Sequence, residues 1–390
     1  MSTDIPLSRR QLLRTVGTGI IGASVAPSIV NAVVPTVARA WSPVGTSGLD
    51  RPIRLNRNDN PYGASREVIA AIARAAQLLA HRGSNEEVER LRTAVAARHR
   101  VPVDHVVVSC GSSEILRAAA NGQLHSDGKL VAASPTFEWF TKFPPRSGTE
   151  IVTVPLTKDY EHDLDAMLAR TGPGPALVYV CNPNNPTGTL TNPKHLEAFV
   201  RALPATTRVV IDEAYHDYVS PSAGYSSWLD RSEVDPRVIV TRSFSKIHGL
   251  AGLRIGYAVA APETLRLLRL DELEDGVSVV SAMAARIALD DADHVRTSKA
   301  RNEDARQEFF NEANARMVRV IDSKTNFVMV NSGRPAAPVV EHFRKHDVVL
   351  PLPFAGFEHY IRVSLGTSED MRAFWRIWDL MPGGGHGMSM

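Results

Sequence analysis

The chain has 390 residues, of which 44% are hydrophobic and 22% charged, a composition that argues against disorder along its length and predicts two packed domains. Its 44 basic and 42 acidic residues give a formal net charge of +2, too small for a broad field that would hold nucleic acid or an anionic membrane. Cys110 and Cys181 are too few for the disulfide framework of a small secreted domain, so we expect both to be reduced and buried.

The first 40 residues have the parts of an export signal. The basic segment SRRQLLR (8–14) precedes a mildly apolar stretch over 16–30, and residues 38–40 match an A-x-A cleavage site. This order predicts a twin-arginine signal peptide that is cleaved after Ala40 and sends a folded protein to the periplasm or the cell exterior. Glycines and a proline interrupt the apolar stretch, so we expect no stable membrane insertion after processing. The alternative is a disordered arm that happens to contain an arginine pair.

Past residue 41, short apolar runs alternate with longer helical patterns, which predicts parallel strands joined by crossover helices. Helices are expected at 66–79, 86–98, 193–203, 262–270 and 279–317, and strands at 106–108, 130–132, 176–180, 209–211, 238–241 and 255–258. From about Val318 the order changes to strand, helix, strand, which predicts a smaller α+β domain. Its elements are expected at 327–330, 337–345 and 361–365.

This pattern divides the chain into five parts. They are a signal peptide at 1–40, an N-terminal arm and helix at 41–80, a large domain at 81–290, a linking helix with a small C-terminal domain at 291–382, and a flexible tail at 383–390. The glycine-rich tail contains His386, which we interpret as part of a low-complexity end and not as a metal ligand.

The first chemical motif, VSCGSSEILRAAA (108–120), leads from a strand through Gly111, Ser112 and Ser113 into a helix. Free N–H groups at such a helix start make an anion site. Ser112 or Ser113 could equally be a plain N-cap, a role that is compatible with anion binding.

The second motif, VYVCNPNNPTG (178–188), places amides and prolines directly after a buried strand. Its turn holds Asn185 in a fixed orientation, where the side-chain amide can bond a phenolic oxygen of a ligand. Such turns are common in loops, so their residue types alone are weak evidence. The motif is informative because it lies between two predicted strands.

The third motif, RVVIDEAYHDY (208–218), ends an apolar strand with the carboxylate of Asp212 and places the phenol of Tyr215 three residues later. A carboxylate against a pyridine nitrogen keeps that nitrogen protonated and makes the ring an electron sink. Asp212 could instead be the N-cap of the next helix. We expect Glu213 and Asp217 to face solvent or to cap a helix.

The fourth motif, TRSFSKIHGLAGLRIGY (241–257), sets Lys246 between hydroxyl residues after a strand and is followed by Arg254 in a glycine-containing turn. An amine forms an imine only when it is unprotonated, so burial and neighbouring positive charge must lower its pKa from about 10.4. Ser243, Ser245 and Arg254 offer two hydroxyls and a guanidinium to a phosphate. The alternative is a surface lysine, with Arg254 in a solvated ion pair.

Taken in this order, the four motifs resemble fold-type I pyridoxal 5'-phosphate (PLP) dependent aminotransferases of class I/II, and in pattern the histidinol-phosphate aminotransferase branch. The resemblance spans about 55–367 and includes LNRNDNPYG (55–63) and SPTFEWF (134–140). It implies the α/β PLP-dependent transferase fold of the aspartate-aminotransferase type, in which a large domain with a mostly parallel sheet flanked by helices carries a smaller α+β domain. It also implies a homodimer.

The resemblance assigns roles to single residues. Lys246 would carry the cofactor as a Schiff base, Asp212 would face its ring nitrogen, and Phe137 would stack over its ring. Asn185 and Tyr215 would bond its phenolic oxygen. The phosphate would be held by Gly111, Ser112, Ser113, Ser243, Ser245 and Arg254. Arg362, in YIRVSLGT, matches the arginine that binds a substrate carboxylate, and Asn326, in KTNFVMV, is a lesser substrate contact or a structural asparagine.

The sequence departs from this branch at two places. At 81–85 the branch has a Tyr-Pro-Asp run whose tyrosine reaches the neighbouring subunit's phosphate, whereas this chain reads HRGSN, in which Arg82 could replace the donor. At VVLPLPFAG (348–356), enzymes that act on histidinol phosphate place an arginine near Leu350, which cannot bind a phosphate. We therefore predict that histidinol phosphate is not the main substrate.

The leading hypothesis is transfer of an amino group between an L-amino acid, or a related amine, and a 2-oxo acid, with Lys246 as general acid and base. A PLP-dependent lyase, decarboxylase or amino-acid oxidase on the same fold would share these residues. An exported, non-catalytic PLP-binding protein is the non-enzymatic alternative. The 13 histidines show no HExxH or similar ligand spacing, so we expect no metal site.

Overall fold

The computed structural model describes residues 52–79, 81, 85–124, 128–142, 148–230, 235–267, 273 and 276–382. The export signal with its cleavage site, Arg82 and the glycine-rich tail lie outside the described residues. Within the described ranges, no helix is both long enough and apolar enough to cross a membrane.

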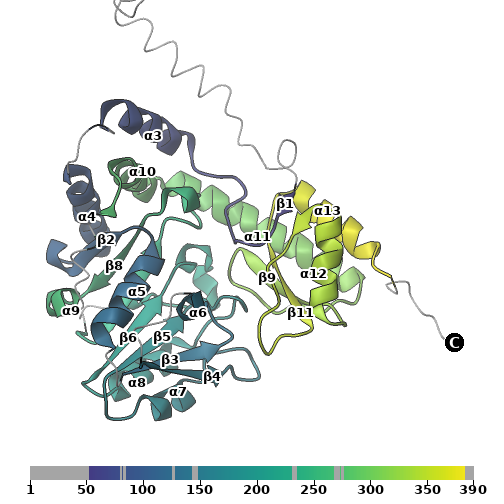
Figure 1. The fold of residues 1–390 in the computed structure, drawn as a ribbon. Helices are drawn as coiled ribbons and strands as arrows, with labels where there is room; N and C mark the ends of the chain where they lie inside the picture. Colours follow the sequence, from purple (N-terminus) through teal and green to yellow (C-terminus); the bar gives the residue numbers. More distant parts are fainter. Residues whose placement is uncertain are drawn as a thin grey trace, which may run out of the picture. The chain divides into compact units, whose positions relative to one another are not determined.

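A seven-stranded sheet forms the centre of the larger part of the fold (Figure 1). Its strands, in spatial order, are β2 (Val106–Ser109), β8 (Gly256–Ala260), β7 (Val238–Ser243), β6 (Thr207–Asp212), β5 (Ala176–Cys181), β3 (Lys129–Ser134) and β4 (Glu150–Pro155). β8 is antiparallel to both of its neighbours, and the other strands are parallel to one another. The predicted mostly parallel α/β sheet is confirmed, and the edge strand β4 is an addition to the predicted set.

Helices cover both faces of this sheet because successive residues of each central strand point to opposite sides. In β5, Leu177 packs against α5 (Ser112–Gln123), whereas Val178 packs against α7 (Leu164–Thr171) and α8 (Pro193–Ala202). Every residue of β5 is buried, as expected for a strand that is covered on both faces.

Further helices surround the two parts of the fold. They are α3 (Arg66–Leu78), α4 (Glu86–His99), α6 (Trp139–Lys142), α9 (Pro262–Leu267), α10 (Val279–Asp290), α11 (Ala292–Ala315), α12 (Ala336–Lys345) and α13 (Ser368–Asp379). The helix predicted over 279–317 is in fact two helices. Asp291 separates α10 from α11, and its carboxylate caps α11 by accepting a hydrogen bond from the backbone N–H of His294 at 2.9 Å.

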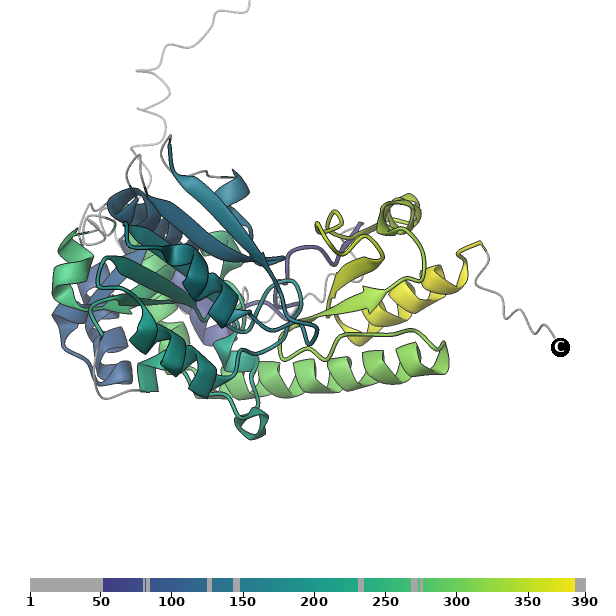
Figure 2. The same cartoon turned by 90° about the horizontal axis from the view of Figure 1, so that it is seen from below.

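A second hydrophobic core lies around β9 (Phe327–Asn331) and β11 (Tyr360–Ser364), which form an antiparallel pair. Phe309 of α11, Phe343 of α12 and Phe374 of α13 belong to this core. Figure 2 shows α11 extending from the larger part of the fold along the smaller sheet. The predicted α+β character of the C-terminal part is confirmed.

The N-terminal segment joins this smaller part. β1 (Ile53–Arg54) pairs in parallel with β10 (Val348–Val349), and the backbone N–H of Ser364 donates to the carbonyl of Leu55 at 3.0 Å. The chain then continues toward the larger sheet, so residues just after β1 lie between the two parts.

The two cysteines differ in exposure. Both are free, and Cys181 in β5 is buried as predicted. Cys110 is only partly buried, because it lies in the turn that leaves β2, where its thiol contacts the carbonyl of Gly276 at 2.8 Å. The prediction that both cysteines are buried was therefore wrong for Cys110.

Candidate active site

The four sequence motifs meet at one edge of the larger sheet. Asp212 at the end of β6 pairs in register with Cys181 of β5 on one side and Thr241 of β7 on the other. Gly256 of β8 pairs with both Ser109 of β2 and Ser243 of β7, which brings the turn after β2 next to the turn after β7. The carboxyl ends of parallel strands are where α/β sheets usually bind ligands.

The turn after β2 forms a concave backbone site. Gly111 has a φ of +84°, and a Cβ added there would lie 2.5 Å from Nη2 of Arg254, so the guanidinium packs directly against the glycine. A Cβ on Gly256 would lie 2.6 Å from the backbone nitrogen of Ser112. Gly111 is the N-cap of α5, so neither serine is the cap, and Ser112 and Ser113 begin the helix where N–H groups have no helical partner.

Two hydroxyls and a guanidinium lie at the end of β7 and in the segment that follows it. Nη1 of Arg254 lies 3.4 Å from Oγ of Ser245 and donates to the carbonyl of Ala251 at 2.8 Å. Oγ of Ser243 accepts from the backbone N–H of Ser245 at 3.1 Å. Among the described residues no carboxylate forms an ion pair with Arg254, so the solvated pair of the alternative interpretation is absent from this part of the chain.

Asp212 is a buried carboxylate at the end of β6. Its Oδ2 accepts from the hydroxyl of Tyr179 at 2.9 Å, and its Oδ1 accepts from the backbone N–H of Ala214 at 3.1 Å. It is not an N-cap, because the next element is the 3-10 turn His216–Tyr218, for which Tyr215 is the cap residue. Burial raises the pKa of the Asp212 carboxyl above its ordinary value.

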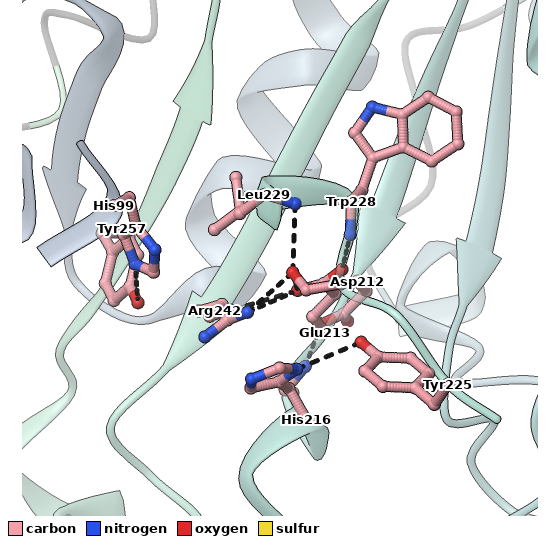
Figure 3. A network of polar contacts seen from close by, with 11 residues as sticks. His99, Asp212, Glu213, His216, Tyr225, Trp228, Leu229, Arg242 and Tyr257 are labelled. Atoms are coloured by element: carbon pink, nitrogen blue, oxygen red, sulfur yellow. Dashed lines mark hydrogen bonds and ion pairs between the residues drawn. The ribbon is translucent and has the colours of Figure 1, made fainter. Parts of the chain in front are cut away.

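Of the two expectations for Glu213, exposure to solvent or capping of a helix, the first was wrong. Glu213 is buried and forms an ion pair with Arg242 at 2.9 Å, and its Oε2 also accepts from the hydroxyl of Ser227 at 2.7 Å (Figure 3). Burial opposes ionisation, but the charge of Arg242, together with His216 and the hydrogen bonds from Ser227 and Trp228, outweighs it and lowers the pKa of the Glu213 carboxyl. Asp217 is half-buried. Glu213 directly follows β6 and Arg242 lies near the end of β7, so this ion pair links the ends of the two strands next to Asp212.

Lys246 lies in the turn after β7, and its amine points into the site. Nζ donates to the carbonyl of Arg57 at 2.9 Å and lies 5.7 Å from the centre of the Tyr215 ring. Burial lowers the pKa of the Lys246 ammonium to about 8, while the carboxylate of Asp59 opposes this shift and the charge of Arg362 reinforces it. An amine with this pKa is partly unprotonated at neutral pH, as a nucleophilic lysine requires.

Three other predicted cofactor contacts are Tyr215, Asn185 and Phe137, of which Tyr215 lies beside this amine. Tyr215 is buried, and its hydroxyl accepts from Nδ2 of Asn58 at 2.9 Å. Asn185 is buried, and its Oδ1 accepts from Nη1 of Arg362 at 2.6 Å. Phe137 is partly buried and packs against the core on the α5 side of the sheet.

Arg362 of β11 and Asn326, which directly precedes β9, carry buried polar atoms that have no partner among the described residues. Nη2 of Arg362 donates to the carbonyl of Asn56 at 2.7 Å, but its Nε has no partner among the described residues. Nδ2 of Asn326 donates to the carbonyl of Asn58 at 3.0 Å, and its Oδ1 likewise lacks a partner within the described ranges. Buried polar atoms are almost always hydrogen-bonded, so these two are suited to a polar ligand.

The sequence motifs did not assign a role to single residues of 55–63, which we call the N-terminal strap. Its Asn56 carbonyl bonds Arg362 and its Asn58 side chain bonds Tyr215, so the strap contacts both sides of the site. The polar run in LNRNDNPYG was a usable signal, because three asparagines within five residues of a segment outside the main sheet call for nearby hydrogen-bond partners.

Gly249 allows the strap to approach the lysine turn. It has a φ of +70°, and a Cβ added there would lie 2.3 Å from the carbonyl oxygen of Gly63. No other residue type fits this contact without moving the strap.

The donor set fits PLP. A phosphate needs hydrogen-bond donors and positive charge, which the backbone at Gly111, the start of α5 and Arg254 supply. A pyridine nitrogen needs a carboxylate, and Asp212 is buried without an ion-pair partner among the described residues. The aldehyde needs an amine, and Lys246 supplies it. No group of three or more metal-ligating side chains occurs among the described residues.

Solved structures share this fold. A histidinol-phosphate aminotransferase from Sinorhizobium meliloti, determined in complex with PLP, superimposes with a TM-score of 0.76 at 26% identity and covers 95% of this chain and 96% of that one. An aspartate aminotransferase from Thermotoga maritima superimposes with a TM-score of 0.74 at 19% identity, over 90% and 98% of the two chains. Fold and site together define a PLP-dependent enzyme of the aspartate-aminotransferase fold.

Sequence comparisons agree. The aminotransferase class I and II family matches residues 50–376. Histidinol-phosphate aminotransferases of Symbiobacterium thermophilum and Shouchella clausii are 33% and 34% identical to this chain, each over 84% of it and over 90% and 88% of their own lengths. The chain belongs to the aminotransferase class I and II family, and it is a PLP-dependent aminotransferase.

Proposed function

We propose that this enzyme moves an amino group between an L-amino acid and a 2-oxo acid, with Lys246 as the residue that holds PLP covalently. Asp212 would pair with the ring nitrogen, Asn185 and Tyr215 would bond the phenolic oxygen, and Phe137 would stack on the ring. The phosphate would be held by Gly111, Ser112, Ser113, Ser243, Ser245 and Arg254. When bound, the cofactor supplies an electron sink for the carbanion that forms as the substrate loses its α-proton.

The observation that carries this proposal is the position of the Lys246 amine. It points into the space shared by Tyr215, the strap and the guanidinium of Arg362, with a pKa lowered by burial to about 8. Freed from the cofactor, Nζ would accept the α-proton of the substrate and then donate a proton as the amino group moves to the cofactor. This is general base and general acid catalysis by one amine, whose pKa lies near the working pH.

Arg362 would hold the carboxylate of the substrate. A guanidinium suits this task because its planar donors match two carboxylate oxygens, and its Nε has no partner within the described residues. The unpaired Oδ1 of buried Asn326 would accept from another polar group of the substrate or from a bridging water. A substrate whose carboxylate is held by Arg362 would have its α-carbon near Lys246.

Histidinol phosphate is not the main substrate in this proposal, although relatives carry that name. The segment 348–356 contains no lysine or arginine. Leu350 is 5% exposed and belongs to the apolar cluster that contains Phe343 and Trp375. A substrate phosphate beside these residues would lose water without gaining a counter-charge, which is costly.

The test is a half-reaction assay. Single L-amino acids and histidinol phosphate are added in turn to the purified PLP-loaded protein, and the loss of the cofactor's absorbance band and the new amino acid formed from an added 2-oxo acid are measured. We expect stoichiometric conversion with a carboxylate-bearing donor and slow conversion with histidinol phosphate. Faster turnover of histidinol phosphate would overturn the substrate proposal, and release of CO2 or ammonia without a new amino acid would overturn transfer.

Two further parts of the proposal rest on sequence. We propose that residues 1–40 direct export by the twin-arginine route, which carries folded and therefore cofactor-loaded cargo. Replacing Arg9 and Arg10 with lysine should keep the protein in the cytoplasm of a twin-arginine-competent host.

We also propose a homodimer in which Arg82 replaces the missing tyrosine donor. Sedimentation at several concentrations tests the dimer, and Arg82→Ala should weaken cofactor binding if the residue reaches the neighbouring site.

A further inference from the structure

Asn58 occupies an unusual position in the N-terminal strap. It is 1% exposed and has a φ of 55°, in the left-handed region that few residues other than glycine adopt. All four of its polar groups are hydrogen-bonded, to Ser364 and Asn326 of the smaller part and to Tyr215 of the larger part. Asn58 therefore connects the N-terminal strap to both the smaller and the larger part of the fold.

The hydrogen bonds of Asn58 have a fixed direction. A backbone N–H can only donate a hydrogen bond, so the N–H of Asn58 donates to Oγ of Ser364 at 2.9 Å. The hydroxyl of Ser364 can then direct its own hydrogen to Oδ1 of Asn58, at 3.0 Å. These two bonds assign the oxygen of the side-chain amide to Ser364, and its NH2 group to Tyr215.

The orientation of the amide determines what the Tyr215 hydroxyl can do. Nδ2 of Asn58 donates to the Tyr215 oxygen at 2.9 Å, so the phenol cannot give its own hydrogen back to Asn58. Among the described residues the Tyr215 hydroxyl donates no hydrogen bond of its own. The hydroxyl hydrogen of Tyr215 is therefore free to bond to a ligand that enters the site.

We propose that Asn58, with Ser364, is a positioning residue that turns the Tyr215 hydroxyl into a hydrogen-bond donor toward the phenolic oxygen of the cofactor. This inference rests on the proposed function, in which Tyr215 contacts that oxygen. A hydrogen bond donated to the oxygen favours its ionised form. Asn58 would thus act on the cofactor through Tyr215 and through the smaller part of the fold, to which Ser364 belongs.

Asn60 provides a matched control. It is also a buried asparagine of the strap, but its Nδ2 donates to the carbonyl of Ile247 at 2.8 Å and to Oγ of Ser298 at 3.2 Å, and it does not contact Tyr215. A general loosening of the strap would follow from a change at either asparagine. A change in the direction of the Tyr215 hydrogen would follow only from a change at Asn58.

The experiment is a pH titration of the absorbance of the bound cofactor. Asn58→Gly removes the amide but tolerates the left-handed backbone, so the variant should fold. We expect its titration midpoint to rise by about half a pH unit, because the Tyr215 hydroxyl can still donate to the ionised oxygen but is no longer held and polarised by the hydrogen bond from Asn58. Asn60→Ala should titrate like the wild type, and Ser364→Ala should give a smaller rise than Asn58→Gly.

A double-variant cycle separates this role from a structural one. If Asn58 acts through Tyr215, Asn58→Gly should add no further shift in a Tyr215→Phe background. A wild-type midpoint in Asn58→Gly, or an equal shift with and without Tyr215, would overturn the inference while leaving the enzyme's function intact. A wild-type protein that shows no cofactor band would instead remove the proposed function itself.

Discussion

The two halves of the active site are assembled in different ways. The half proposed to hold the cofactor consists of backbone turns and side chains at neighbouring strand ends, such as the Gly111 turn and the segment from Ser243 to Arg254. The half proposed to hold the substrate depends on a contact between residues that are 306 positions apart, the hydrogen bond from Arg362 to the carbonyl of Asn56. Changes in the first half should therefore alter cofactor binding, and changes in the second should alter substrate use.

The largest effect is expected where the halves meet. Lys246→Ala should lower the rate of amino transfer by about 10⁴-fold, because it removes both the covalent anchor and the general acid and base. Rates are measured with saturating PLP and a donor identified in the half-reaction assay. Lys129→Ala, which changes a lysine paired with Glu150 at the other end of the sheet, should stay within about twofold of the wild type. Comparable activity in the two variants would contradict the assignment.

A change in the substrate half should separate the two functions. Arg362→Lys keeps the charge but loses the paired donors, so kcat/KM for the amino donor should fall by about 10–100-fold, the value of one or two charge-assisted hydrogen bonds. The Kd of the cofactor, measured by fluorescence quenching, should remain unchanged. A large loss of cofactor affinity would show that the halves are not separable.

A change in the cofactor half should do the reverse. In Gly111→Ala the new Cβ would meet the guanidinium of Arg254, at a φ that alanine adopts with strain, so cofactor affinity should weaken by about tenfold. Gly172→Ala is the matched control, because Gly172 also has a positive φ, of +68°, but nothing lies within 4 Å of an added Cβ. Equal affinities in the two variants would mean that crowding at Arg254 does not matter.

The smallest effect concerns pH. The unprotonated amine is the reactive form, so the rate at which the apoprotein attaches PLP should rise with pH, with a midpoint at the Lys246 pKa of about 8, and level off at higher pH. The carboxylate of Asp59 raises the pKa of that ammonium, so Asp59→Asn should move the midpoint to lower pH by less than about one unit. Stopped-flow absorbance measures both profiles. A midpoint that moves upward would contradict the sign.

The difference between the halves also explains what the sequence could predict. Strand-end motifs are local, so the sheet and the positions of Asp212 and Lys246 beside it followed from apolar runs and the residues after them. Burial of Glu213 was missed because its partner Arg242 lies on the next strand, and strand order is not written in local spacing. The contacts of Asn58 were missed for the same reason, since they depend on how the smaller part of the fold lies against the larger one.

The central claim is tested most directly by reducing the PLP-loaded protein with borohydride and mapping the modified peptide by mass spectrometry. The account predicts one reduced pyridoxyl phosphate group per chain, attached to the lysine in the segment between Ser245 and Ile247. An unmodified protein, or a label on another lysine, would contradict it.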